Sequence, residues 1–397
     1  MNGHNNNSDD DISFILNELG ETREHYFNAI APPIIQTSNF AFGKVDDMRK
    51  AFRDEYSTLI YSRGRNPTVD ILCKKLAALD GAEDCLVFSS GSAAIYASVL
   101  ANVKSGDHIV SVNKPYSWAQ KIFNEILPRF NVTTTYIDGT QIENFERAVL
   151  PNTKIIYLET PNSWTFHLQD LSTIAELAKA ENITTICDNS FCTALFQKPI
   201  VHGIDLVLQS ATKYIGGHSD VVAGVLTGSK PMIKKIFDLE FMAIGSGISP
   251  FNAWLLLRGL RTLPARLDKI TDTTWKVISF LKQHPKVEKV IFPFDEDFEQ
   301  LDLARKQMTG ACGLLTFIIK AGSVAAIESF CEHLHHILIA VSWGGHESLI
   351  IPGCAAINPE DFDYNNHDHR AMRLYVGLEE ANYIIKDLER GFAAVQP

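Results

Sequence analysis

The central part of the chain alternates between continuous apolar runs and stretches in which apolar residues recur every three or four positions. Continuous runs are typical of strands buried on both faces, whereas the longer spacing is typical of amphipathic helices. This alternation predicts an α/β fold with a mainly parallel sheet covered by helices on both faces. We expect strands at 85–90, 108–112, 132–137, 153–160, 183–188 and 205–210, and helices at 69–81, 92–103, 117–127 and 170–182.

The pattern differs on either side of this centre and predicts three parts of the chain. Residues 1–60 start with the polar sequence MNGHNNNSDDD and continue with a short amphipathic helix and an extended, turn-rich stretch. We expect a tail followed by an arm that reaches another subunit. Residues 61–253 are expected to form the α/β domain, and residues 254–397 a smaller α+β domain. The second domain should contain helices up to residue 284, at 323–337 and at 379–392, and an alternating strand at 309–322.

Composition limits the classes of partner. The net charge of -11 disfavours nucleic acid and anionic membranes, because phosphate binding requires a basic surface. No run approaches the ~18 apolar residues of a membrane span, and the start lacks the apolar segment of a signal peptide, so we expect a cytoplasmic protein. The seven cysteines form no CxxC pair and no HExxH occurs, so we expect neither a disulfide framework nor a metal ion.

Side chains that could take part in chemistry lie at or just after the ends of two predicted strands. Asp188 ends one apolar strand, and Lys213 lies just after another. The carboxyl ends of such strands meet at one edge of an open α/β sheet, where ligands bind. Together with Ser210 and Thr212 they meet the needs of pyridoxal 5'-phosphate: an amine for a Schiff base, an acid for the pyridinium nitrogen and donors for phosphate. A solvated lysine and a capping or ion-paired aspartate are the alternatives.

Two other segments are candidates for binding phosphate. Gly91 and Ser92 follow a predicted strand and open a helix, so their backbone N–H groups can bind an anion. Taken alone this is better explained as an ordinary strand-to-helix turn, but with Ser210 and Thr212 a phosphate site is favoured. In YSRGRNPT (61–68), Arg63 or Arg65 could bind phosphate in a bidentate manner, with a solvated loop as the alternative.

The C-terminal part adds candidates for substrate binding. Arg373 lies in a predicted strand, where a buried arginine needs a carboxylate from substrate or protein. Ser342 and Trp343 precede a glycine pair and are expected to form a pocket wall.

Eight segments match one family in content and in order. They are YSRGRNPT (61–68), SSGSAAI (89–95), ETPNS (159–163), CDNSF (187–191), QSATKYIGGHSDVVAG (209–224), SPFNAWLLLRGLRTL (249–263), SWGGHESL (342–349) and RLYVGLEE (373–380). The chain resembles the Cys/Met-metabolism pyridoxal-phosphate enzymes, the fold-type I transsulfuration group, over nearly all of its length after about residue 30. The resemblance implies a seven-stranded-type sheet, a smaller C-terminal α+β domain and a sulfur amino acid substrate.

The resemblance also implies cofactor-binding roles. Lys213 would bond to pyridoxal phosphate, Tyr116 would stack on its ring, and both would act in catalysis. Asp188 would hold the pyridinium nitrogen. The phosphate would be bound by Gly91, Ser92, Ser210 and Thr212.

Other implied roles concern the substrate and a second subunit. Tyr61 and Arg63 would reach the phosphate of a neighbouring subunit's cofactor, which implies a dimer and a dimer of dimers. Arg373 would bind the α-carboxylate of the substrate. Ser342, Trp343 and Ser163 would lie beside it.

Within the family, three segments resemble bacterial cystathionine β-lyase: ETPNSWTFHLQD (159–170), TGACGLLTFIIK (309–320) and SWGGHESLI (342–350). Members that act at the γ-carbon more often have leucine in place of Trp343 and asparagine in place of Ser163. We therefore expect β-elimination of L-cystathionine to homocysteine, pyruvate and ammonia. YSRGRNPT is closer to the γ-type pattern, so cystathionine γ-synthase, cystathionine γ-lyase, methionine γ-lyase and O-acetylhomoserine sulfhydrylase remain alternatives. A non-catalytic regulator that binds pyridoxal phosphate is a further alternative, although Lys213, Tyr116 and Arg373 are all present.

Overall fold

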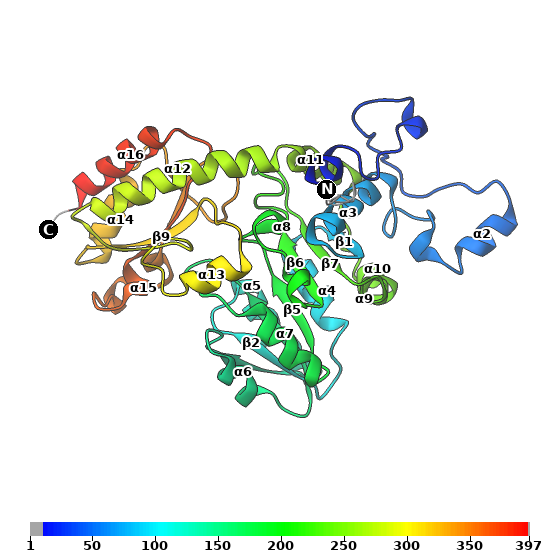
Figure 1. Cartoon of the computed structure of the whole chain (residues 1–397), viewed down its shortest axis with the longest axis horizontal. Coiled ribbons are helices and arrows are strands. Elements are labelled where there is room, and N and C mark those ends of the chain that lie inside the picture. Colours follow the sequence, from blue (N-terminus) through cyan, green and yellow to red (C-terminus); the bar gives the residue numbers. More distant parts are fainter. Residues whose placement is uncertain (1–10, 396–397) are drawn as a thin grey trace, which may run out of the picture.

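The computed structural model describes residues 11–395, and the first ten residues of the predicted tail lie outside this range. A sheet of seven strands forms the centre of the larger part of the molecule (Figure 1). Strands β2 to β6 run parallel, and β7 is antiparallel to both of its neighbours. In spatial order the strands are β1 (Asp84–Phe88), β7 (Gly224–Gly228), β6 (Leu206–Ser210), β5 (Thr184–Asp188), β4 (Thr153–Glu159), β2 (His108–Val112) and β3 (Thr133–Ile137).

Helices cover both faces of this sheet, as the apolar pattern predicts. On one face Ile109, Tyr157 and Leu208 pack against α4 and α5. On the other face Val110 and Leu158 pack against α7. The helices before and around the sheet are α3 (Pro67–Asp80), α4 (Gly91–Leu100), α5 (Ser117–Lys121), α6 (Ile142–Ala148), α7 (Leu171–Ala180), α8 (Thr193–Phe196), α9 (Lys230–Ile236) and α10 (Met242–Ile244).

Strand β7 is absent from the sequence prediction. Its segment GVLTG is short and carries glycine at both ends, which weakens any strand signal. Close packing requires both glycines: a Cβ at Gly224 would lie 2.3 Å from the carbonyl oxygen of Ser90, and one at Gly228 would lie 2.7 Å from Leu206. The feature that conceals this strand in the sequence therefore lets it fit between β1 and β6.

A second, smaller domain is built on a five-stranded sheet. Its strands in spatial order are β10 (Leu338–Ile339), β11 (Leu349–Pro352), β12 (Ala371–Tyr375), β9 (Leu314–Ile319) and β8 (Val287–Ile291). The helices of the C-terminal part are α11 (Pro250–Arg261), α12 (Leu263–Gln283), α13 (Leu301–Gln307), α14 (Val324–Glu332), α15 (His367–Arg370) and α16 (Ala381–Ala394). The long helix α12 runs along this part of the molecule beside α16 (Figure 1).

Strand β9 differs from its predicted alternation, because all six of its residues are buried. On one face Phe317 packs against Phe330 of α14 and Phe392 of α16. On the opposite face Thr316 donates a hydrogen bond to the carbonyl oxygen of Trp164, in the larger part of the molecule. The strand is therefore covered on both sides. None of the helices between residues 11 and 395 combines the length and apolar content needed to cross a bilayer.

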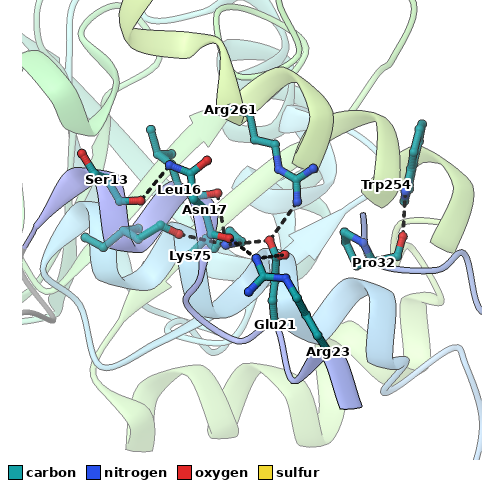
Figure 2. A network of polar contacts seen from close by, with 10 residues as sticks. Ser13, Leu16, Asn17, Glu21, Arg23, Pro32, Lys75, Trp254 and Arg261 are labelled. Atoms are coloured by element: carbon teal, nitrogen blue, oxygen red, sulfur yellow. Dashed lines mark hydrogen bonds and ion pairs between the residues drawn. The ribbon is translucent and has the colours of Figure 1, made fainter. Parts of the chain in front are cut away.

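The N-terminal segment is anchored by a buried ionic network (Figure 2). Helix α1 (Ile12–Asn17) is followed by Glu21, whose side chain is fully buried and pairs with Lys75 of α3 at 3.1 Å and Arg261 of α11 at 3.0 Å. Arg23 lies 3.4 Å from the same carboxylate. Beyond this anchor the chain extends away from the sheet toward α2 (Val45–Ala51) (Figure 1). It exposes Phe27, Ile30, Val45 and Phe52.

Candidate active site

A cavity of about 940 Å³ lies where loops that follow strands of the large sheet meet the second sheet. Parallel strands place their carboxyl ends at one edge, which is where open α/β sheets bind ligands. The cavity is lined by eleven of the residues expected from the sequence: Gly91, Ser92, Tyr116, Ser163, Asp188, Ser210, Thr212, Lys213, Ser342, Trp343 and Arg373. The structure thus brings together side chains that are up to 282 positions apart (373 − 91).

Backbone donors and hydroxyls meet at one end of the cavity. Ser90 caps α4 by accepting a hydrogen bond from the N–H of Ala93 at 3.1 Å, which leaves the first N–H groups of the helix available to an anion. Ser210 lies against Gly91, where an added Cβ would come within 3.4 Å of the serine hydroxyl. Thr212 is fixed by hydrogen bonds with the backbone of Ala223. This end of the cavity therefore has hydrogen-bond donors for a phosphate, and the glycine at position 91 leaves room for the phosphate to approach the backbone.

Lys213 lines the cavity and is the candidate amine for bonding to a cofactor. Its Nζ lies 2.6 Å from the hydroxyl of Ser342 and 5.4 Å from the ring centroid of Trp343. Burial lowers the pKa of Lys213 to about 8, and the positive charge of Arg373 acts in the same direction. A lysine with this pKa is partly neutral near pH 7 and can act as a nucleophile or a base.

The loop that carries Ser342 approaches the lysine backbone closely. Ser342 and Gly344 both adopt left-handed backbone angles, with φ of 83° and 89°. A Cβ at Gly344 would lie 2.7 Å from the carbonyl carbon of Lys213. Glycine at this position therefore allows the loop to reach the amine.

Two buried acids end neighbouring strands. Asp188 on β5 and Glu159 on β4 are partners in the strand register. Burial raises the pKa of Asp188, whereas its hydrogen bond from Ser190 and the charge of Lys213 oppose this shift. Burial raises the pKa of Glu159 to about 8, and the charge of Asp188 adds to the effect. Asp188 therefore has two interactions that favour its charged form, the hydrogen bond from Ser190 and the charge of Lys213.

Glu159 is a site residue that the sequence analysis did not select. Its two carboxylate oxygens accept hydrogen bonds from the N–H of Tyr116 at 2.6 Å and the N–H of Ser163 at 3.3 Å. It thereby holds the loops that carry two expected site residues. The signal was present in the sequence, because Glu159 ends an apolar strand as Asp188 does.

Arg373 lies on β12 and lines the cavity with a partly buried guanidinium. It lies 3.4 Å from the hydroxyl of Ser163 and 4.9 Å from the ring centroid of Trp164. Burial lowers the pKa of Arg373 to about 10, and Glu159 opposes the shift. Among residues 11–395 it forms no ion pair with a carboxylate. The arginine is thus available to a carboxylate ligand.

Tyr61 and Arg63 do not line this cavity. Both lie in the segment before α3, where the Arg63 guanidinium lies 5.8 Å from the ring centroid of Tyr61. The tyrosine is 46% exposed. Arg65 forms an ion pair with Asp70 at 3.1 Å. Arg63 forms no ion pair with a carboxylate within the described residues, so it is the arginine of this segment that could bind an anion.

Pyridoxal phosphate fits the residues present. A phosphate would find backbone N–H groups and hydroxyls at Gly91, Ser92, Ser210 and Thr212, and the ring nitrogen would find the buried acid Asp188. Lys213 supplies an amine whose pKa is already lowered. Tyr116, in the loop after β2, is exposed and lines the cavity.

Comparisons with known proteins agree with this fit. The family model described as Cys/Met metabolism PLP-dependent enzyme matches residues 15–393. The chain is 37% identical over 374 residues to an L-methionine gamma-lyase of Treponema denticola, with 92% of each chain covered. It is 35% identical over 374 residues to a cystathionine gamma-lyase of Bacillus subtilis, covering 93% of this chain and 96% of the relative. The crystal structure of cystathionine gamma-lyase from Lactobacillus plantarum complexed with L-serine aligns with a TM-score of 0.88 at 34% identity, covering 97% and 99% of the two chains.

Proposed function

Since the chain belongs to the Cys/Met metabolism PLP-dependent enzymes, we propose that it is a carbon–sulfur lyase that acts by γ-elimination on a sulfur amino acid. The products would be a thiol, ammonia and 2-oxobutyrate. Relatives that are 33–37% identical over most of the chain are named methionine gamma-lyase or cystathionine gamma-lyase. These names support γ-elimination over the β-elimination expected from three local segments.

The single structural observation that supports a lyase is the position of Lys213, whose Nζ contacts Ser342 in a cavity that is also lined by Arg373. When bound, pyridoxal phosphate supplies an electron sink for negative charge that develops beside the α-carbon of the substrate. Arg373 would bind the α-carboxylate, which fixes the α-carbon relative to the lysine. Lys213 Nζ, neutral in part at pH 7, would then remove the α-proton.

The remaining residues would control protons and orientation. Asp188 would keep a proton on the ring nitrogen, because a buried carboxylate stabilises a cation beside it. Tyr116 or Lys213 would deliver a proton to the sulfur that leaves. Ser342 would direct the amine through its 2.6 Å contact with Nζ.

A β-elimination of L-cystathionine remains a second candidate. The ring centroids of Trp343 and Tyr214 are 5.2 Å apart, and the Trp343 ring lies 5.4 Å from Lys213 Nζ. The hydroxyl of Ser163 lies 3.4 Å from the guanidinium of Arg373. Trp343 and Ser163 are the two residues that resemble the β-lyase pattern. The keto acid distinguishes the reactions, because β-elimination yields pyruvate and γ-elimination yields 2-oxobutyrate.

The test is to incubate the purified holoenzyme with L-methionine and, separately, with L-cystathionine and to identify the keto acid. We expect 2-oxobutyrate, and we expect Lys213→Ala to abolish it. Pyruvate and homocysteine formed from L-cystathionine would show that the protein is a β-lyase and would refute the proposal. Loss of the absorbance of the bound cofactor in Lys213→Ala, with no product from either substrate in the wild type, would indicate the regulator.

We further propose that Tyr61 and Arg63 act in the cofactor site of a second copy of the chain. Their position outside their own cavity, in the segment before α3 where both side chains are exposed, supports this. A mixture of Arg63→Ala and Lys213→Ala chains that have been dissociated and reassociated should regain activity, because mixed dimers contain one intact site. Absence of regained activity in mixed dimers would contradict shared sites.

A further inference from the structure

Trp164 lies directly beside the arginine that is proposed to bind the substrate. The guanidinium carbon of Arg373 is 4.9 Å from the ring centroid of Trp164, which is within the range of a cation–π contact. Both side chains line the cavity. Ser163 supplies one further polar contact at 3.4 Å, at the long limit of a hydrogen bond. The tryptophan ring is therefore the principal feature that orients this cation.

The backbone of Trp164 is fixed on two sides. Its N–H donates to the side-chain oxygen of Asn162 at 2.9 Å, and Asn162 is buried. Its carbonyl oxygen accepts a hydrogen bond from Thr316 at 2.8 Å. Thr316 on β9 is the register partner of Arg373 on β12. Arg373, Trp164 and Thr316 are thus linked in pairs: Arg373 contacts Trp164, Trp164 accepts a hydrogen bond from Thr316, and Thr316 lies opposite Arg373 in the strand pair.

An aromatic partner has a different effect from an acidic one. A carboxylate beside Arg373 would neutralise the guanidinium and compete with the carboxylate of the substrate. A tryptophan ring holds the planar group without neutralising it. Glu159 is the acid that acts on the pKa of Arg373, and its two oxygens already accept hydrogen bonds from the N–H groups of Tyr116 and Ser163.

We propose that Trp164 is a positioning residue that presents Arg373, uncompensated and correctly oriented, to the α-carboxylate of the amino acid substrate. This inference rests on the proposed function of Arg373. It does not depend on whether the elimination occurs at the β- or the γ-carbon.

The test measures binding rather than turnover. L-Norleucine has the size of methionine but no leaving group, and pentylamine is the same molecule without the α-carboxylate. Dissociation constants of the holoenzyme for both would be measured by calorimetry for the wild type, Trp164→Leu and Trp164→Phe. The matched control is Trp275→Leu, because Trp275 is partly exposed on α12 and does not line the cavity.

We expect Trp164→Leu to weaken norleucine binding by about three- to thirty-fold, the range of a cation–π contact, and to leave pentylamine binding within twofold. Trp164→Phe should recover most of the affinity, and Trp275→Leu should match the wild type. Equal losses for both ligands would show that Trp164 only shapes the cavity and would overturn the proposal. Unchanged norleucine binding in Trp164→Leu would also overturn it.

These outcomes are separable from the proposed function. If Arg373→Leu leaves norleucine binding unchanged, the assignment of the arginine is wrong, and Trp164 has no cation to position. If Arg373→Leu weakens norleucine binding and Trp164→Leu does not, only the tryptophan inference fails.

Discussion

Replacing Glu21 by glutamine should detach the N-terminal segment from the rest of the molecule. The substitution keeps the shape of the side chain but removes the charge that compensates Lys75, whose side chain is 1% exposed. Removing one partner of a buried ion pair costs about 3–5 kcal/mol. Arg23 and Arg261 are 34% and 29% exposed, so their share is small because solvent screens them.

An upper limit follows from the titration of Lys75. Burial lowers the pKa of Lys75, and the charge of Glu21 opposes that shift. Without Glu21 the lysine can avoid the penalty by losing its proton, which at pH 7 costs about 4.6 kcal/mol from an ordinary lysine pKa. The neutral amine would still donate to the carbonyl oxygens of Ile15 and Leu16, at 2.9 and 3.2 Å. We therefore expect a loss of about 3 to 4.6 kcal/mol in the free energy that holds this segment in place.

Hydrogen exchange followed by mass spectrometry measures the free energy of local opening for this segment. Amides within residues 12–26 should exchange about 150- to 2,500-fold faster in Glu21→Gln, while the core strands of the large sheet change little. Asp46→Asn, which breaks exposed pairs with Arg49 and Lys50 on α2, is the control and should change exchange by less than about threefold. Exchange in Glu21→Gln that stays within threefold of the wild type would refute this account of the anchor.

Two further predictions concern the amine. Because burial and Arg373 lower the pKa of Lys213 to about 8, pyridoxal phosphate should bind the apoprotein faster as the pH rises, about tenfold per unit below 8 and with a plateau above it. Arg373→Leu should move this midpoint upward because one repelling charge is gone; stopped-flow absorbance would measure both, and a midpoint near 10 in the wild type would contradict the assigned pKa. Gly344→Ala should reduce cofactor affinity at least tenfold, because its Cβ would lie 2.7 Å from the Lys213 backbone, whereas Gly322→Ala, with no atom within 4 Å, should bind normally. Equal affinities of the two variants in a cofactor titration would exclude that close approach as the reason for the glycine.

Much of the site was predictable because parallel strands place their carboxyl ends together. Asp188 and Lys213 each follow an apolar strand, and the rule that unites such ends needs no knowledge of packing. The same rule also applies to Glu159, which ends the neighbouring strand β4. The cavity contacts of Trp164 were not predictable in this way, because Thr316 is 152 positions away and lies on the other sheet.

Long-range partners also conceal the anchor at Glu21. Lys75 and Arg261 are separated from it by 54 and 240 positions (75 − 21 and 261 − 21), and no local pattern connects them. The choice between reactions shows another limit of local motifs. Trp343 and Ser163 favoured β-elimination, whereas similarity over most of the chain favours γ-elimination. The choice between the β- and the γ-carbon therefore depends on a measured product and not on these two side chains.

The most direct measurement of the central claim is the identity of the keto acid that the holoenzyme releases from L-methionine and L-cystathionine, with Lys213→Ala as the control. We predict 2-oxobutyrate from the wild type and none from the variant. Pyruvate as the product, or undiminished 2-oxobutyrate from Lys213→Ala, would contradict the account.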